Sequence, residues 1–391
     1  MEDRSGELNR PCPSLMHLFL AFFKLGATAF GGPAIVAYMR QLAVNQKRWL
    51  DEKTARDGIA LCQTIPGATA MQMSAYVGFR ARGIGGAAVS FIGFGLPAFL
   101  LMMILSAFYA KTHTLPSVVS IFNGLQAIVV AIVAYATFSF GRPLVKTWQN
   151  GVLALTAAAL FGLKLHPILV ISFAAFLGVA LYFKQPVQLG EKPPTKSSPP
   201  PSLLWLIFAA LLGTAALFRL NRRLFDLAML MFRIDLFAFG GGYASVPMMF
   251  HEVVEVRRWM DGPTLLNGIA LGQVTPGPIV ITATFIGYLW QGFWGGVVAT
   301  ASVFLPSFLI VIGAIPYFDR IRSSPHLIKV FTGIFCSFVG LLLTVTFRFA
   351  IHLPWDLPRL LITLGALAAL FLKVGLLWVV LLGAGVSWIV L

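Results

Sequence analysis

The stretch Pro263–Phe318 contains 56 residues without one Asp, Glu, Lys or Arg. A bilayer core about 30 Å thick needs roughly 20 apolar residues per helix, so this stretch is long enough for two crossings. The chain is 58% hydrophobic and 11% charged, whereas soluble domains are about 25% charged. The fold class predicted is therefore an all-α polytopic membrane protein. Further uncharged stretches cover 58–79, 83–110, 114–141, 147–163, 165–183, 203–218, 330–347 and 374–391.

Two more helices are predicted near 15–39 and 224–250, each with a basic residue in mid-span. Together with the uncharged stretches they give about 12–13 crossings, including broken helices. Strands of a membrane barrel are excluded because no alternating ten-residue segments occur.

The chain is an internal duplication. An ungapped shift of 210 residues aligns 48–67 with 258–277 and gives 11 identities in 20 positions. A shift of 209 aligns Phe23-Lys24 with Phe232-Arg233, and Ala29-Phe30-Gly31-Gly32 with Ala238-Phe239-Gly240-Gly241. The sequence therefore predicts an N-terminal transporter repeat at 1–182 and a C-terminal transporter repeat at 224–391.

The segment between the repeats, 183–223, combines a Pro/Ser/Lys-rich linker with one apolar helix at 203–218. If each repeat crosses the membrane an even number of times, this extra helix makes the second repeat enter from the opposite face. We therefore expect two inverted repeats, an architecture common among secondary transporters. A different parity of crossings at the broken helices would remove that argument.

Glycine pairs interrupt the first helix of each repeat, in AFGGP (29–33) and AFGGGY (238–243). Glycines allow helices to approach closely, so a packing face is one interpretation. Their recurrence beside a proline or a third glycine favours a helix break that lines a cavity. The candidate binding residues here are Gly31, Gly32, Gly240 and Gly241.

A second matched break is QTIPGAT (63–69) and QVTPGPIVIT (273–282). Proline lacks an amide donor and glycine permits a turn, so both sequences interrupt a helix at membrane depth. A broken helix presents free N–H groups and a positive dipole end, which suit an anion. The alternative is a kinked helix whose polar groups bond within the bundle. The candidate binding residues are Gln63, Thr64, Pro66, Gly67, Thr69, Gln273, Thr275, Pro276, Gly277 and Thr282.

Lys24 and Arg233 occupy matched positions about ten residues into their helices, close to the bilayer centre. A cation there is costly and usually functional, so the pair predicts a positive midplane site. The alternatives are snorkelling to an interface and internal ion pairs. Asp235 lies two residues after Arg233 and faces another side of the helix. It is a candidate coupling residue, and its counterpart is Gly26, so its role is one-sided.

The blocks Arg48-Trp49-Leu50-Asp51 and Arg258-Trp259-Met260-Asp261 precede the broken helices. The aspartates are expected to cap the following helices, and the tryptophans to sit at the headgroups. The alternative is a gating salt bridge within each block, so Arg48, Asp51, Arg258 and Asp261 are gating candidates.

The net charge is +15, from 29 Lys and Arg against 14 Asp and Glu. In a membrane protein such an excess anchors loops to anionic lipid rather than to nucleic acid, and it also suits an anionic solute. Arg80, Arg82 and Arg348 are predicted interfacial anchors. Three scattered cysteines, no HExxH and no GxxxxGK[ST] leave no basis for a metal, a cofactor or an enzyme.

The duplicated FGG helix, the repeated R-W-x-D…GIAL-x-Q…PG block and the linker resemble the chromate ion transporter family in its long, two-domain form. The string GIALGQVTPGPIVITATFIGY in the second repeat carries this resemblance best. It implies an inner-membrane protein whose two halves are oppositely oriented. It also implies chromate export driven by the membrane potential or a proton gradient, with sulfate as a look-alike. The residues it implicates are Gly31, Gly32, Pro33, Gly240, Gly241, Gln63, Pro66, Gly67, Gln273, Pro276, Gly277 and Pro278.

One departure from the family pattern is Ala68, which stands opposite Pro278. It indicates a less rigid first break. The mechanism predicted is alternating access by rocking of two bundles, with Lys24 and Arg233 neutralising the oxyanion. Two alternatives stay open, a proton- or cation-coupled carrier of another solute centred on Asp235, and a passive anion channel. Membrane lipid is an expected partner, nucleic acid is not, and a homodimer is left open.

Overall fold

The structure is a computed structural model of the chain, and it describes residues 13–30, 34–163, 165–182, 202–239, 242–318 and 324–391. These residues form helices joined by short connections, and no strand occurs among them. The prediction of an all-α fold is therefore confirmed. The predicted linker lies almost entirely outside the described residues.

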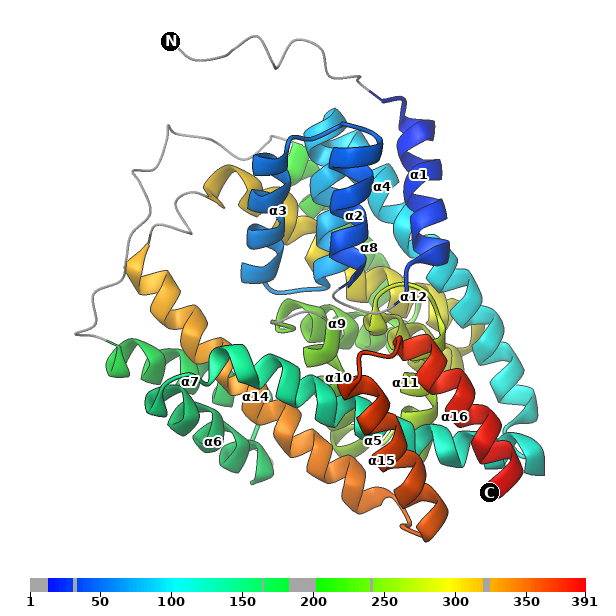
Figure 1. Ribbon diagram of the computed structural model, residues 1–391. Coiled ribbons are helices and arrows are strands. Elements are labelled where there is room, and N and C mark those ends of the chain that lie inside the picture. The colour runs from blue at the N-terminus through cyan, green and yellow to red at the C-terminus, as the bar shows by residue number, and fades with distance from the viewer. Residues whose placement is uncertain (1–12, 31–33, 164, 183–201, 240–241, 319–323) are drawn as a thin grey trace, which may run out of the picture.

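The first repeat begins with short helices and ends with a long helix and two short ones (Figure 1). Its elements are α1 (Leu15–Thr28), α2 (Ala34–Arg40), the π-helical segment η1 (Gln41–Gln46), α3 (Glu52–Thr64), α4 (Thr69–Thr112), α5 (Pro116–Leu144), α6 (Trp148–Gly162) and α7 (Pro167–Leu181). The connecting helix α8 is Ser202–Leu220.

The second repeat has the same order of elements, including a π-helical segment before the third helix. Its elements are α9 (Arg222–Leu236), η2 (Gly242–Ala244), α10 (Ser245–Met249), η3 (Phe250–Val256), α11 (Gly262–Val274), η4 (Ile279–Ile281), α12 (Thr282–Ala314), η5 (Ile315–Tyr317), α14 (Pro325–His352), α15 (Leu357–Phe371) and α16 (Leu376–Val390).

The first helices of the first repeat form two antiparallel hairpins of half-length helices. In the first hairpin, His17 near the start of α1 lies 3.1 Å from Lys47, just beyond the end of η1. In the second, the Tyr76 hydroxyl of α4 donates to the Thr54 carbonyl of α3 at 3.1 Å. With 14 residues, α1 is too short to cross a bilayer, so its hairpin ends inside the membrane.

A sharp turn divides α4 and α12 at matched positions. Gly83 and Gly292 both have φ of 62°, which glycine adopts without steric cost. Each helix therefore consists of a short arm that closes the second hairpin and a long arm that crosses the membrane.

In the described part of the chain, five helical segments are long and apolar enough to cross a membrane: Thr69–Thr112, Pro116–Leu144, Ser202–Leu220, Ile279–Tyr317 and Leu327–His352. Shorter apolar helices are Leu15–Thr28, Pro167–Leu181, Leu357–Phe371 and Leu376–Val390. The predicted crossings thus divide into full-length and half-length helices, a distinction that sequence length alone does not make.

The two repeats pack reciprocally. The long helices pair with their own counterparts, α4 with α12 and α5 with α14. The orange α14 runs past α6 and α7 in Figure 1, and α5 likewise packs against α15 and α16. Each contact of one repeat with the other thus has a matching contact in which the two repeats have changed places. Such matching contacts indicate a pseudo-two-fold arrangement, as expected from the duplication.

Helix α8 has no buried residue, although it is strongly apolar. Leu204 and Trp205 are more than 70% exposed to the surroundings. An exposed apolar helix of 19 residues fits the hydrocarbon of a bilayer. The connection between the repeats therefore includes one further membrane span.

Candidate functional site

The helix breaks of the two repeats meet and hydrogen-bond reciprocally. The Gly67 N–H donates to the Ala238 carbonyl at 2.7 Å, and the Gly277 N–H donates to the Ala29 carbonyl at 3.1 Å. Each PG break thus binds the helix that carries the FGG motif in the other repeat. Backbone amides released by the breaks are used to join the repeats.

The local sequence explains these breaks. Helix α3 ends at Ile65 in extended backbone, and Pro66 then removes one amide donor. Gly67 and Gly277 follow with φ of 121° and 110°, a region of backbone that favours glycine. Gly31, Gly32, Pro33, Gly240 and Gly241 lie outside the described residues.

The predicted threonine donors bond to carbonyls of their own segments. The hydroxyls of Thr64, Thr275 and Thr282 donate to Ala60, Gly272 and Ile279 at 2.7, 2.9 and 2.9 Å. Thr69 is half-buried at the first position of α4. In this conformation the three hydroxyls therefore stabilise the break itself.

The two glutamines of the PG motifs lie in different surroundings. Gln63 is exposed, whereas Gln273 is buried and its side-chain amide nitrogen has no hydrogen-bond partner among the described residues. A buried donor without a partner costs about 1–3 kcal/mol, so the Gln273 amide is poised to donate to a ligand oxygen.

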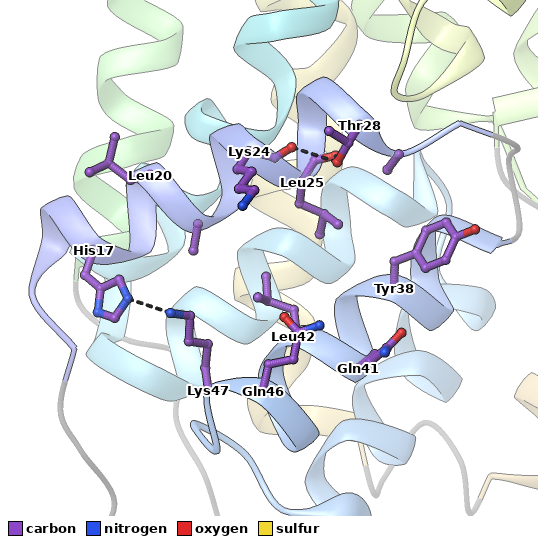
Figure 2. Close-up of a pocket in the computed structure, with 12 residues that line it drawn as sticks. His17, Leu20, Lys24, Leu25, Thr28, Tyr38, Gln41, Leu42, Gln46 and Lys47 are labelled. Atoms are coloured by element: carbon purple, nitrogen blue, oxygen red, sulfur yellow. Dashed lines mark hydrogen bonds between the residues drawn. The ribbon is translucent and has the colours of Figure 1, made fainter.

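A pocket of about 590 Å³ opens between α1 and the α2–η1 segment (Figure 2). Lys24 points into this space from α1, and Gln41 and Gln46 face it from η1. The complete lining is His17, Leu20, Ala21, Lys24, Leu25, Thr28, Ala29, Tyr38, Gln41, Leu42, Gln46 and Lys47. Because Ala29 accepts the Gly277 amide, the pocket reaches the joined breaks.

The pocket is electropositive. Its described lining residues include Lys24 and Lys47 and no carboxylate, and the Lys47 Nζ lies 3.1 Å from His17 Nε2. In the described part of the chain, Lys24 has no ion-pair partner. A free ammonium group beside neutral donors of Gln and Tyr side chains suits a small anion.

Arg233, the counterpart of Lys24, is neutralised. Its guanidinium donates to Glu252 of η3, and the same carboxylate lies 3.7 Å from Arg257 Nε and 3.8 Å from His166 Nε2. Glu252 is buried, and the 210-residue shift places Leu42 opposite it. The matched cations therefore have different environments because the first repeat lacks this glutamate.

A second carboxylate, the half-buried Glu255, extends the ion pairs of the second repeat. His251 Nδ1 lies 2.8 Å from it, and Arg348 donates to it at 2.6 Å. Arg348 also donates to the Phe161 carbonyl of α6 at 2.6 Å. Arg348 is therefore held by a half-buried carboxylate and a carbonyl, and its role as an interfacial anchor stays a prediction.

The aspartates of the R-W-x-D blocks cap helices as expected. Asp51 accepts the Thr54 amide at 2.7 Å, and Asp261 accepts the Thr264 amide at 2.9 Å. Trp49, however, is only 4% exposed and packs against His17 and Phe22, so it does not reach the headgroups. Its burial follows from the hairpin, which folds the segment after η1 onto α1.

Both arginines of these blocks have left-handed backbone. Arg48 and Arg258 have φ of 54° and 53°, at the junction between the π-helical segment and the cap. This conformation is unusual for a side chain of this size and marks a matched chain reversal.

Replacing both capping aspartates by asparagine tests the cap against the gating salt bridge. Asparagine caps helices about as well as aspartate, so Asp51→Asn and Asp261→Asn should retain stability and transport. Alanine at Asp261 should cost about 0.5–2 kcal/mol in thermal unfolding. Transport lost in the asparagine variants, with stability intact, would instead favour a charge-dependent gate.

Sequence reasoning missed several lining residues, namely His17, Tyr38, Gln41, Gln46 and Lys47. A signal for part of them exists, because His17, Lys24 and Thr28 are spaced by seven and four residues and share one helix face. Glu252 was missed because it follows the predicted helix, in a segment where helical periodicity changes.

The sequence matches a family model described as chromate transporter over residues 16–179 and 225–388. It is 44% identical over 364 residues to an uncharacterized transporter of Methanocaldococcus jannaschii, covering 92% of this chain and 90% of the relative. It is 32% identical to a probable chromate transport protein of Synechococcus elongatus, covering 94% and 93%. It is 28% identical to a chromate transport protein of Cupriavidus metallidurans, covering 92% and 88%. No solved structure matches the chain.

Proposed function

The chain belongs to the chromate transporter family, and on that premise we propose that it exports chromate, or a similar tetrahedral oxyanion such as sulfate, by alternating access. The observation that carries this proposal is the contrast between two matched cations. In the described part of the chain, Lys24 lines a polar pocket without an ion-pair partner, whereas Glu252 neutralises its counterpart Arg233. The protein is a multi-pass membrane protein, and we place it in the inner membrane. The repeats are placed at 1–182 and 224–391, joined by 183–223.

The charge of the pocket supports an oxyanion. Chromate and sulfate are dianions with four oxygens, and an ammonium group makes strong charge-assisted hydrogen bonds to such oxygens. Lys24 and Lys47 supply two positive charges, while Tyr38, Gln41 and Gln46 supply neutral donors. A site with this donor set neutralises a dianion without burying an uncompensated charge.

The difference between the repeats supports alternating access. The first hairpin is open, whereas ion pairs of Glu252 and Glu255 with Arg233 and Arg348 hold the matching segment of the second repeat together. We propose that rocking exchanges these two environments, so that the oxyanion bound at Lys24 is exposed to one face at a time. The breaks at Gly67 and Gly277 are the joint about which the repeats move.

The pocket is expected to discriminate weakly between chromate and sulfate. The two dianions share charge and shape, and specificity requires contacts that differ between ligands. Membrane lipid is the partner that we assign to the exposed apolar face of α8.

Transport in everted membrane vesicles tests this function. Labelled chromate should enter in a gradient-dependent manner, and external sulfate should suppress its entry. Sulfate loaded inside the vesicles should accelerate chromate entry, because a carrier returns faster with a substrate bound. Sulfate suppression without this acceleration would indicate a passive anion channel. Absence of chromate and sulfate movement, with the protein present in the membrane, would contradict the proposal.

A further inference from the structure

Asp235 is a fully buried carboxylate whose hydrogen bonding is incomplete. It lies in α9 with 0% exposure. Its Oδ2 accepts hydrogen bonds from the Ser307 amide at 3.0 Å and the Ser307 hydroxyl at 2.6 Å, both in α12. Its Oδ1 is also buried and has no partner among the described residues.

No cation among the residues that the structure describes pairs with this carboxylate. Helices α8, α10 and α12 pack against α9, and their only titratable side chains are Arg219 and Tyr288. Arg219 and Tyr288 are each more than ten residues along their own helix from the position that packs beside Asp235. This separation corresponds to about 20 Å. The nearest basic residue in α9, Arg233, is paired with Glu252. Asp235 is connected to the first-repeat break through the Ser307 hydroxyl, which also accepts the Ala68 amide.

A chain of hydrogen bonds connects Asp235 to the first break. The Ala68 N–H donates to the Ser307 hydroxyl oxygen at 2.7 Å, and the Ser307 hydroxyl donates to Asp235. Ala68 follows Gly67, whose amide binds the Ala238 carbonyl. The hydrogen bonding of the Asp235 carboxyl group in the second repeat therefore depends on the position of the PG break in the first repeat.

The pseudo-equivalent positions cannot form this chain. The counterparts of Asp235, Ser307 and Ala68 are Gly26, Ala98 and Pro278. These lack the carboxylate, the hydroxyl and the amide hydrogen respectively. All three members of this hydrogen-bond chain are thus present at the first PG break and absent at the second, although the two breaks are matched.

We propose that Asp235 is the proton-binding site of this transporter and that Ser307 and Ala68 link its protonation to the position of the first break. A neutral carboxyl group is compatible with this buried site, with the proton on Oδ1 and both Ser307 bonds kept. Releasing that proton to water leaves a buried charge, which requires water or a moved break to solvate it. The proton comes from water on one face and leaves to water on the other, and no other bond changes. This inference rests on the proposed oxyanion transport.

Proteoliposomes containing the full chain provide the test, with labelled sulfate as the probe. Two activities are measured in each preparation, sulfate exchange without a gradient and sulfate accumulation driven by an imposed pH gradient. In the wild type both are expected. In Asp235→Asn, gradient-driven accumulation should fall at least tenfold more than exchange, because asparagine mimics only the protonated form. The matched control is Asp226→Asn, on the exposed start of the same helix, which should retain the wild-type ratio.

Ser307→Ala keeps the test informative if asparagine at Asp235 impairs folding, because the fold already accommodates Ala98 at the equivalent place. Ser307→Ala removes the hydroxyl donor to the charged carboxylate and keeps the backbone N–H donor, so the midpoint of the pH dependence of exchange should move upward by about one pH unit. An unchanged midpoint in Ser307→Ala overturns the inference. An Asp235→Asn protein that still accumulates sulfate when a pH gradient is imposed also overturns it. A wild-type protein without sulfate or chromate exchange instead overturns the proposed transport.

Discussion

Replacing Lys24 by alanine is expected to weaken the apparent affinity for chromate and sulfate by about tenfold to a hundredfold. Hydrogen bonds to charged groups contribute about 1.5–3 kcal/mol, and each 1.4 kcal/mol corresponds to a factor of ten. Lys24 has no other ion-pair partner in the described part of the chain, so its removal leaves no unpaired carboxylate behind. The protein should therefore fold normally, and the loss should appear in the KM for sulfate exchange.

The controls for Lys24 separate local charge from total charge. Lys24→Arg keeps a cation in the pocket and should retain most of the affinity, whereas Lys53→Ala removes an exposed cation of α3 and should have no effect. Normal exchange by a well-expressed Lys24→Ala, Arg233→Ala double variant would contradict a role for either cation.

Arg233 should respond differently from Lys24. Its removal leaves the buried Glu252 carboxylate with only the more distant Arg257 and His166. Stability should therefore fall, by an amount reduced by the partial exposure of Arg233. Adding Glu252→Gln to Arg233→Ala removes the orphaned charge and should restore stability. The two matched cations thus have different predicted effects, one on binding and the other on holding η3 in place.

The sequence predicted the elements of the fold better than their lengths. The repeated blocks around Gly67 and Gly277 predict two breaks at matched positions, and both breaks occur. Hydropathy does not reveal that α1 ends inside the membrane. A short helix of a hairpin and an equally long part of a full crossing have the same apolar composition. The turns at Gly83 and Gly292 likewise divide α4 and α12 into arms that hydropathy does not separate, since Gly292 lies within a stretch without a charged residue.

Contacts between the repeats could not be predicted from either repeat alone. Ser307 is an ordinary serine in an apolar helix, and its role depends on Asp235 and Ala68, which are 72 and 239 residues away in the chain. The pairing of Arg233 with Glu252 depends similarly on η3, where the first repeat carries Leu42. The duplication predicts which positions correspond. Side chains that differ between corresponding positions, such as Glu252 and Leu42, decide which of the matched cations is neutralised.

Replacing Gly67 by alanine is expected to be the most damaging single change at the joint between the repeats. Its φ of 121° is strained for any residue with a Cβ, at a cost of about 1–3 kcal/mol. A Cβ there would also lie 2.3 Å from the Ser307 hydroxyl oxygen and 2.6 Å from Gln72 Nε2. Crowding of this kind adds about 1–3 kcal/mol. Thermal unfolding in detergent should show the loss, accompanied by loss of sulfate exchange.

The second repeat supplies the matched comparison for this prediction. Gly277 has a similar φ of 110°, but among the described residues a Cβ there would meet only Ala98, at 3.0 Å. Gly277→Ala should therefore destabilise the protein less than Gly67→Ala. Combining Gly67→Ala with Ser307→Ala removes the clash with the Ser307 hydroxyl and should recover that part of the loss, while the backbone strain and the contact with Gln72 remain. Gly213→Ala in α8, with open space around it, should be neutral. Equal losses at Gly67 and Gly277, without recovery in the double variant, would mean that backbone strain alone sets the cost, and that Ser307 does not pack against the joint as described.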